Sequence, residues 1–174
     1  MSVLVLIALS FISHFIADFI LQPRDMARDK SGHFSVLISH IERQGAALAI
    51  ASLVPFTIHY RSLFMGPLVA ILFGVLNMIG HGVIDWYLWR VYKANVSKRL
   101  MTEAESDAKE WSKRLDLDNK PIDSKLVERQ KEIKYAHKVQ TFQYWEDKLF
   151  YDFIGFDQLL HGLTIIAVTF LFWR

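Results

Sequence analysis

Cysteine is absent from the 174-residue sequence, and residues that interrupt helices are scarce, with 4 prolines and 8 glycines. Without cysteine there can be no disulfide, thiolate metal ligand or cysteine nucleophile, so any metal must be bound by nitrogen and oxygen atoms. An excess of one charge sign is also lacking, since 20 Lys and Arg against 18 Asp and Glu give a formal net charge of +2. This balance does not indicate a nucleic-acid-binding protein.

Hydrophobic residues, by contrast, make up 52% of the chain and are concentrated in blocks. A helix needs about 20 mostly apolar residues to span a bilayer. Four stretches meet this requirement, namely residues 2–21, 34–59, 63–91 and 149–173. The sequence therefore predicts an all-α fold in which a four-helix transmembrane bundle forms a single integral membrane domain over residues 1–174.

The second of these stretches is the least hydrophobic. Its early turns carry charged and polar side chains, and only residues 45–58 are purely apolar. Pro55 predicts a kink in this helix, because proline cannot donate the backbone hydrogen bond that the helix requires. A shallow, partly re-entrant helix is the alternative to a full span.

The segment 93–148 is hydrophilic and carries acidic and basic residues in near balance. A capping-box pattern at Thr102 predicts a helix over residues 102–115, and after a turn Ser124 is predicted to cap a second helix over residues 124–139. We expect a soluble cytoplasmic helical hairpin inserted between the third and fourth membrane helices. Mixed charge of this kind predicts a solvated surface, and the alternative is an arm that binds a cytoplasmic protein partner.

Basic residues near the ends of the apolar stretches predict their orientation. They flank the first and third connections, at Arg24, Arg28 and Lys30 and at Lys93, Lys98 and Arg99, whereas the second connection has only Arg61. Basic residues are enriched on the cytoplasmic side of membrane proteins. We therefore expect a protein of the cytoplasmic (inner) membrane, with loops one and three in the cytoplasm and both termini outside.

Three pairs of a histidine and an aspartate lie four residues apart within apolar stretches: His14/Asp18, His81/Asp85 and Asp157/His161. This spacing puts both members of a pair on one helix face. In the predicted orientation these residues and His40 fall at one depth, about 5–15 Å from the inner boundary, given a rise of about 1.5 Å per residue. Because ionisable groups are costly in a bilayer unless they face a protein interior, the pattern predicts one polar centre in the cytoplasmic half.

Imidazole and carboxylate groups without sulfur form a ligand set for zinc or manganese, with iron as a further choice. Seven such groups exceed the needs of one tetrahedral ion, so we expect one or two divalent ions. The predicted ligands are His14, Asp18, His40, His81, Asp85, Asp157 and His161. Polar neighbours predicted to orient them are Ser10, Gln22, Asn77 and Gln158. Glu42 is the predicted general base.

These patterns resemble a known group of proteins. The segments His14-Phe-Ile-Ala-Asp18-Phe-Ile-Leu-Gln22, His40, His81-Gly-Val-Ile-Asp85 and Asp157-Gln-Leu-Leu-His161 are similar to those of the domain of unknown function 3307 family. Its members are small prokaryotic and phage integral membrane proteins without an established function. The resemblance extends over the four predicted spans, while the hairpin looks like an insertion. More distantly, the pattern resembles the membrane-bound metal-dependent hydrolases, which implies hydrolytic chemistry.

We therefore expect an integral membrane metal-dependent hydrolase that cleaves a phosphoester of a lipid-like substrate at the cytoplasmic leaflet, with membrane lipid as its partner. The alternatives are a small proton or metal-ion transporter, a di-metal oxidase or desaturase, and a noncatalytic membrane protein whose His/Asp cluster only fastens helices. A transporter would need polar residues throughout the outer half of the bundle. Residues 2–9, 66–76 and 164–172 offer almost none.

Overall fold

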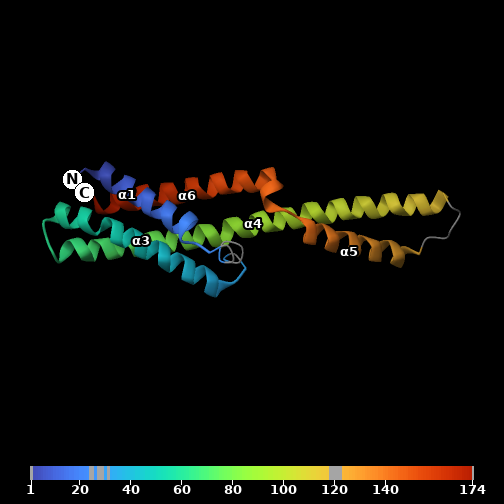
Figure 1. The fold of residues 1–174 in the computed structure, drawn as a ribbon, viewed down its shortest axis with the longest axis horizontal. Coiled ribbons are helices and arrows are strands. Elements are labelled where there is room, and N and C mark those ends of the chain that lie inside the picture. The colour runs from blue at the N-terminus through green and yellow to red at the C-terminus, as the bar shows by residue number, and fades with distance from the viewer. Residues whose placement is uncertain (1, 24–25, 27–29, 31, 118–122, 174) are drawn as a thin grey trace. The chain divides into compact units, whose positions relative to one another are not determined.

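The computed structural model describes residues 2–23, 26, 30, 32–117 and 123–173, which form helices and connecting turns without a β-strand (Figure 1). The prediction of an all-α protein is thereby confirmed for the described part of the chain. The residues divide into two compact units. Unit 1 comprises Met1–Arg90 and Phe153–Arg174, and unit 2 comprises Val91–Asp152.

Among the described residues, four helices contribute to unit 1. Helix α1 (Val3–Phe15) continues directly into a π-helical turn, η1 (Ile16–Ile20), and α3 covers Phe34–Tyr60. The first part of α4 (Met65–Leu117) and most of α6 (Lys148–Phe172) complete the unit. Pro55, predicted to kink the second helix, lies inside the unbroken α3, and the third predicted span begins two residues later than expected.

Successive helices of unit 1 run in opposite directions. The Tyr60 hydroxyl at the end of α3 donates a hydrogen bond to the Phe172 carbonyl at the end of α6, with an O···O distance of 2.6 Å. His59 stacks on Trp173 at a ring-centroid distance of 4.1 Å. Leu6, near the start of α1, belongs to the same apolar core as Phe56. The beginnings of α1 and α4 therefore lie with the ends of α3 and α6.

This end of unit 1 is filled by a purely apolar core. Its members come from all four helices and are Leu6, Leu48, Phe56, Val69, Ala70, Phe73, Ile165 and Val168. Burial of such side chains contributes the largest favourable term to packing in water, while in a membrane close van der Waals contact takes over that role. The polar residues of the predicted centre lie further along each helix, so the unit has an apolar half and a polar half.

Helices α3 and α4 approach each other closely at two glycines. A Cβ atom on Gly74 would lie 2.5 Å from the Gly45 carbonyl oxygen and 2.8 Å from the Ala49 Cβ. A Cβ atom on Gly45 would lie 2.9 Å from the Met78 Cβ. No side chain fits at such distances, so glycine is required for this backbone contact, as in close helix pairs of membrane proteins. The contact holds the two helices that carry His40 and His81.

In the part of the chain that the structure describes, three helices are long and apolar enough to cross a membrane: the α1–η1 helix (Val3–Ile20), the stretch Met65–Leu115 of α4, and α6. Helix α3, the least hydrophobic of the four stretches predicted to span, is not among them. The outer surface of unit 1 is strongly apolar, with Leu4, Ile50 and Phe64 each at least 70% exposed. Apolar side chains outside and ionisable ones inside reverse the order expected of a protein in water.

In unit 2, α4 departs from the prediction by continuing without interruption through Thr102 to Leu117. The expected helix start at residue 102 is therefore wrong, and the Thr102 hydroxyl instead donates to the Lys98 carbonyl of the preceding turn at 3.0 Å. No glycine or proline occurs between Gly82 and Pro121, so nothing in the sequence breaks the helix there. A capping-box pattern inside such a stretch remains helical.

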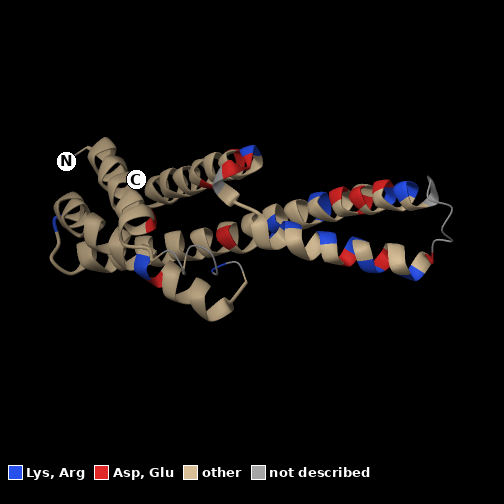
Figure 2. Cartoon of the chain, turned by 45° about the vertical axis from the view of Figure 1, so that its right-hand side comes forward, with Lys and Arg blue, Asp and Glu red and all other residues tan. Residues whose placement is uncertain are grey.

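Helix α5 (Ser124–Thr141) and a short 3₁₀ turn, η2 (Tyr144–Glu146), complete unit 2. The predicted cap, Ser124, is the first helical residue, and Asp123 caps the helix by accepting a hydrogen bond from the Lys125 backbone N–H at 2.9 Å. Most of the predicted turn lies outside the described residues. The charged residues of the chain are concentrated along α5 and the second part of α4, whereas the helices of unit 1 carry few (Figure 2).

Candidate metal centre

All seven predicted ligands are buried and lie together in the polar half of unit 1. Helix α1 with its π turn contributes one histidine and one aspartate, α3 contributes one histidine, and α4 and α6 contribute one pair each. Each of these residues is at most 8% exposed. We call them the cluster: His14, Asp18, His40, His81, Asp85, Asp157 and His161. The alternating helix directions bring these positions to one level.

The first pair is formed at the junction of α1 and η1. His14 ends the α-helical part and Asp18 lies within the π turn, with 3.4 Å between His14 Nε2 and Asp18 Oδ2. A π turn inside a helix is uncommon and often occurs at functional sites, because it redirects a side chain. The pair thus keeps its predicted proximity, although the helix geometry differs from the regular α-helix expected.

Helices α3 and α4 meet at two histidines and an aspartate. The Nε2 atoms of His40 and His81 are 2.8 Å apart. They lie 3.1 Å and 3.2 Å, respectively, from the same oxygen, Oδ2 of Asp85. His40 Nε2 is also 3.3 Å from Asp18 Oδ1, so it lies between carboxylates from two other helices.

Helix α6 closes the cluster with Asp157 and His161. The His161 ring stacks on His81 with centroids 3.9 Å apart, and its centroid is 5.1 Å from that of His14. Asp157 Oδ2 lies 3.6 Å from His161 Nδ1. Nitrogen and oxygen atoms of four helices therefore face a common interior.

The spacing of these atoms is compatible with bound ions. Three sets of residues each offer ligand atoms that all lie within 4.8 Å of one another. They are His14 with Asp18, His81 and His161; His40 with His81 and Asp85; and Asp85 with Asp157 and His161. Because the sets share residues, they describe one continuous group of donors that could hold one or two ions.

Several donors and acceptors in the cluster have no hydrogen-bond partner among the described residues. These atoms include Nε2 of His14, both ring nitrogens of His161, and Oδ1 of Asp85 and of Asp157. A cavity of about 10 Å³ lies between His14, His81, His161 and Asn77, which is room for about one water molecule or an ion. Buried polar atoms without partners are costly, and a water molecule or an ion in this cavity would lower that cost.

Two residues of the cluster were not predicted from the sequence. Gln44 donates a short hydrogen bond to Asp18 Oδ1 and lies 3.4 Å from the His14 carbonyl oxygen. Lys30 is 6% exposed, and its Nζ lies 2.9 Å from Asp85 Oδ2. The spacing of four residues between His40 and Gln44 puts both on one helix face and could have predicted Gln44. Lys30 precedes α3, so no helical spacing could have predicted its position.

The predicted neighbours of the ligands lie as follows. Ser10 and Asn77 are buried, and Asn77 donates to the Phe73 carbonyl at 2.8 Å. Gln158 donates to Asp157 Oδ2 at 3.3 Å, and Gln22 is partly buried next to η1. The structure does not bring Glu42 to the cluster. Its side chain is exposed, because position 42 lies on a different face of α3 from His40 and Gln44.

Unit 2 contains a second group of polar residues, around Asp147. This carboxylate accepts hydrogen bonds from the Tyr92 hydroxyl at 3.1 Å, Arg99 Nη1 at 3.0 Å and the Leu149 backbone N–H at 3.2 Å. Burial alone would raise the pKa of Asp147, but the bonds from Arg99 and Tyr92 outweigh burial and lower it below its usual value. Both carboxylate oxygens are thus satisfied.

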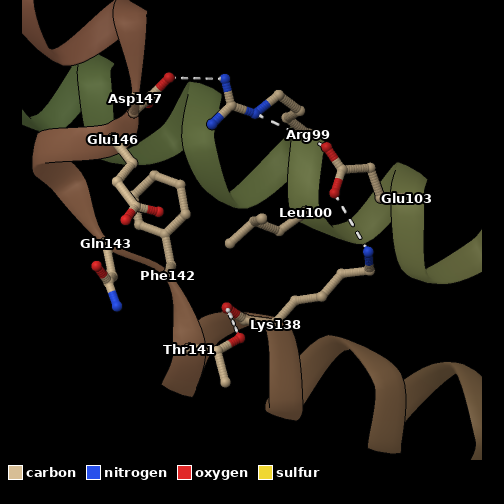
Figure 3. A pocket seen from close by; sticks show the side chains of 9 residues that line it. All are labelled: Arg99, Leu100, Glu103, Lys138, Thr141, Phe142, Gln143, Glu146 and Asp147. Carbon is tan, nitrogen blue, oxygen red and sulfur yellow. Dashed lines mark hydrogen bonds and ion pairs between the residues drawn. The ribbon is translucent and has the colours of Figure 1, made fainter.

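A surface hollow of about 440 Å³ lies beside this group, between α4, α5 and η2 (Figure 3). Arg99 lies between Asp147 and Glu103, and Lys138 Nζ is 3.3 Å from Glu103 Oε2 and 3.2 Å from Asp107 Oδ2. Acidic groups outnumber basic ones here, but each basic side chain lies between two carboxylates. The pairs of Lys138 link α5 to α4, and because they are partly exposed they contribute little stability.

Comparison with protein families matches residues 5–103 to the family described as Protein of unknown function (DUF3307). The chain belongs to this family. The matched region includes His14, Asp18, His40, His81 and Asp85. It ends before α6, so the match does not test the resemblance that the sequence predicts for the fourth stretch. Curated proteins and solved structures give no match.

Proposed function

We propose that this DUF3307 protein is an integral membrane metal-dependent hydrolase that cleaves a phosphoester of a lipid-like substrate at the cytoplasmic leaflet. The observation that carries the proposal is the convergence of seven buried imidazole and carboxylate groups, several of them without hydrogen-bond partners. Divalent cations are the occupants that such donors favour. Hydrogen bonding between helices would not require so many unpaired atoms.

The exposed apolar surface of unit 1 supports a location in a membrane. We propose that α3 crosses the bilayer together with the three more apolar helices. Its polar residues His40 and Gln44 are buried toward the cluster, whereas Ile50 and Val54 are exposed. We further propose that loops one and three are cytoplasmic, because they carry more basic residues than loop two; the cluster then lies in the inner half of the membrane.

The donor sets overlap. His14, Asp18, His81 and His161 form a four-residue set, which is sufficient for one tetrahedral ion. Each three-residue set contains Asp85 and one histidine of the four-residue set, His81 or His161, so a second ion would compete with the first for that histidine. Bound divalent ions would supply a water of lowered pKa and polarise a phosphoryl oxygen. Zinc and manganese fit this set best, followed by iron.

Residues of the chain itself would bind and orient the reacting groups. Gln44 fixes the Asp18 carboxylate, so that this ligand is held before an ion arrives. Glu42 is exposed, so we assign proton acceptance to the oxygen of Asp157 that has no partner, while its other oxygen would bind the ion. The apolar core closes the other half of unit 1, which favours a one-sided pocket over a transport path.

Metal analysis of the detergent-purified protein tests the proposal. We expect one or two equivalents of zinc or manganese in the wild type and none in a His81→Ala/Asp85→Ala variant. Thr169→Val is the matched control, because Thr169 is buried in the apolar half and its hydroxyl donates to the Ile165 carbonyl of its own helix. A wild type without metal, or a double variant that keeps it, would exclude a metal centre.

Activity is tested separately on the metal-loaded protein. We expect it to release the headgroup or phosphate from a phospholipid in mixed micelles, and to lose this activity when a chelator removes the metal. Metal-dependent liposome flux of protons or cations without hydrolysis would instead identify a transporter. Bound metal with neither activity would indicate a structural centre, and deletion of residues 124–139 would then test for a protein-binding role of unit 2.

A further inference from the structure

Lys30 has no role in the binding of a cation, yet it is buried within the cluster. Its Nζ lies 2.9 Å from Asp85 Oδ2, the same oxygen that His40 and His81 approach. A buried ammonium group persists only when it is paired with an opposite charge. An ammonium group also repels metal cations, so its presence beside predicted ligands needs a separate explanation.

The formal charges of the cluster suggest that explanation. Asp18, Asp85 and Asp157 with Lys30 leave two formal negative charges if the imidazoles are neutral, and one divalent ion would neutralise them. A second divalent ion would leave two positive charges. A loaded two-ion centre would therefore attract anions, of which a phosphoester together with hydroxide is a matching pair.

We infer that Lys30 is a substrate-binding residue with two partners: it binds Asp85 while no cation is present, and it binds an anionic oxygen of the phosphoester after a cation has bound Asp85. The inference rests on the proposed function and specifies an anionic phosphate as the group recognised. Lysine suits such an exchange, because its ammonium group sits on a flexible four-carbon chain and binds phosphate as a point charge.

Chemical labelling of lysines in the wild-type protein, read by mass spectrometry, tests both halves of the inference. Without metal, Lys30 should react slowly, since it is buried against Asp85. Zinc alone should increase its labelling at least several-fold, and zinc with inorganic phosphate should restore protection. The exposed Lys98 is the internal control and should not change. Unchanged labelling of Lys30 on addition of zinc, or no protection by phosphate, would overturn the inference.

Variants give a second measurement. Lys30→Met should bind zinc about 10-fold or more tightly, because the competing charge is gone, and phosphate about 10-fold or more weakly in the zinc-loaded form. Lys30→Arg should retain phosphate binding, and Lys98→Met should match the wild type in both. Weaker zinc binding or unchanged phosphate binding in Lys30→Met would contradict the inference. A wild type that binds no metal would instead refute the proposed function, and this inference with it.

A comparison of two phosphate ligands distinguishes a lipid substrate from a soluble one. Inorganic phosphate and phosphatidic acid in mixed micelles are compared for protection of Lys30 in the zinc-loaded protein. Protection by phosphatidic acid at lower concentration supports a lipid substrate, as proposed. Equal or stronger protection by inorganic phosphate keeps Lys30 as the phosphate-binding residue but assigns it a soluble phosphate compound.

Discussion

Each compact unit buries carboxylates, but the two units treat them differently. In unit 2, Asp147 receives hydrogen bonds from a tyrosine, an arginine and a backbone N–H, and both its oxygens are satisfied. In unit 1, Asp85 and Asp157 each keep an oxygen without a hydrogen-bond partner, next to two histidines that also have unpartnered nitrogens. The same kind of side chain is thus fully hydrogen-bonded in one unit and incompletely hydrogen-bonded in the other.

This difference separates a structural group from a candidate binding site. A satisfied buried carboxylate fastens its neighbours and needs nothing further. A group of carboxylates and imidazoles with unpaired atoms carries a free-energy cost that a bound cation would offset. The comparison therefore predicts that a divalent cation stabilises unit 1 and leaves unit 2 unchanged.

The largest expected effect is the response of the two units to zinc. At a free zinc concentration about 1,000-fold above the dissociation constant, binding stabilises the liganded state by about 4 kcal/mol. Hydrogen exchange read by mass spectrometry should then slow in peptides covering residues 10–22 and 78–88. Peptides covering residues 93–115 and 124–141 should exchange as before. Equal slowing of hydrogen exchange in both units, or no slowing in unit 1, would contradict the prediction that zinc stabilises unit 1 alone.

How far the sequence predicts this centre depends on whether a feature is local. The His/Asp spacings and the apolar stretches are local, and they correctly indicate helices whose polar faces converge. The all-α class and the family resemblance are confirmed. The four membrane spans, their orientation and the metal remain predictions, because periodicity reports which face is polar and not what binds there.

Other features depend on tertiary structure or on competing local signals. Lys30 reaches Asp85 from the segment before α3, and no periodic pattern fixes that conformation. The capping box at Thr102 competes with an unbroken run of helix-forming residues, which prevails, so α4 has no break there. The carboxylate of Glu42 suits a general base, but its position two residues after His40 points it away from the cluster.

An intermediate effect is expected from Gln44→Ala. Gln44 holds the Asp18 carboxylate, and the loss of such an outer partner typically weakens metal binding 10- to 100-fold, or about 1.4–2.7 kcal/mol. Competition with a chromophoric chelator measures the zinc affinity. Glu42→Gln is the matched control on the same helix and should bind zinc as the wild type does. If Glu42→Gln weakens zinc binding as much as Gln44→Ala, the assignment of the metal site to the face of α3 that carries Gln44 is wrong.

The smallest effect is expected in unit 2, from Asp147→Asn. Because the folded-state pKa of Asp147 is lowered, its stabilising contribution is complete above the ordinary carboxyl pKa and is lost as the pH falls through the lowered value. Arg99 is 42% exposed, so solvent screening limits the effect to about 1 kcal/mol or less. At neutral pH, hydrogen exchange around residues 92–100 should be faster in the variant than in the wild type, and the two should converge at acid pH.

Glu110→Gln is the control for this prediction. Glu110 is in an exposed pair with Arg114, and its substitution should not change exchange around residues 92–100 at either pH. The difference in hydrogen exchange between variant and wild type should be the same with and without zinc, because Asp147 already has its hydrogen-bond partners. A zinc-dependent difference would contradict the distinction between a structural carboxylate in unit 2 and metal-binding carboxylates in unit 1.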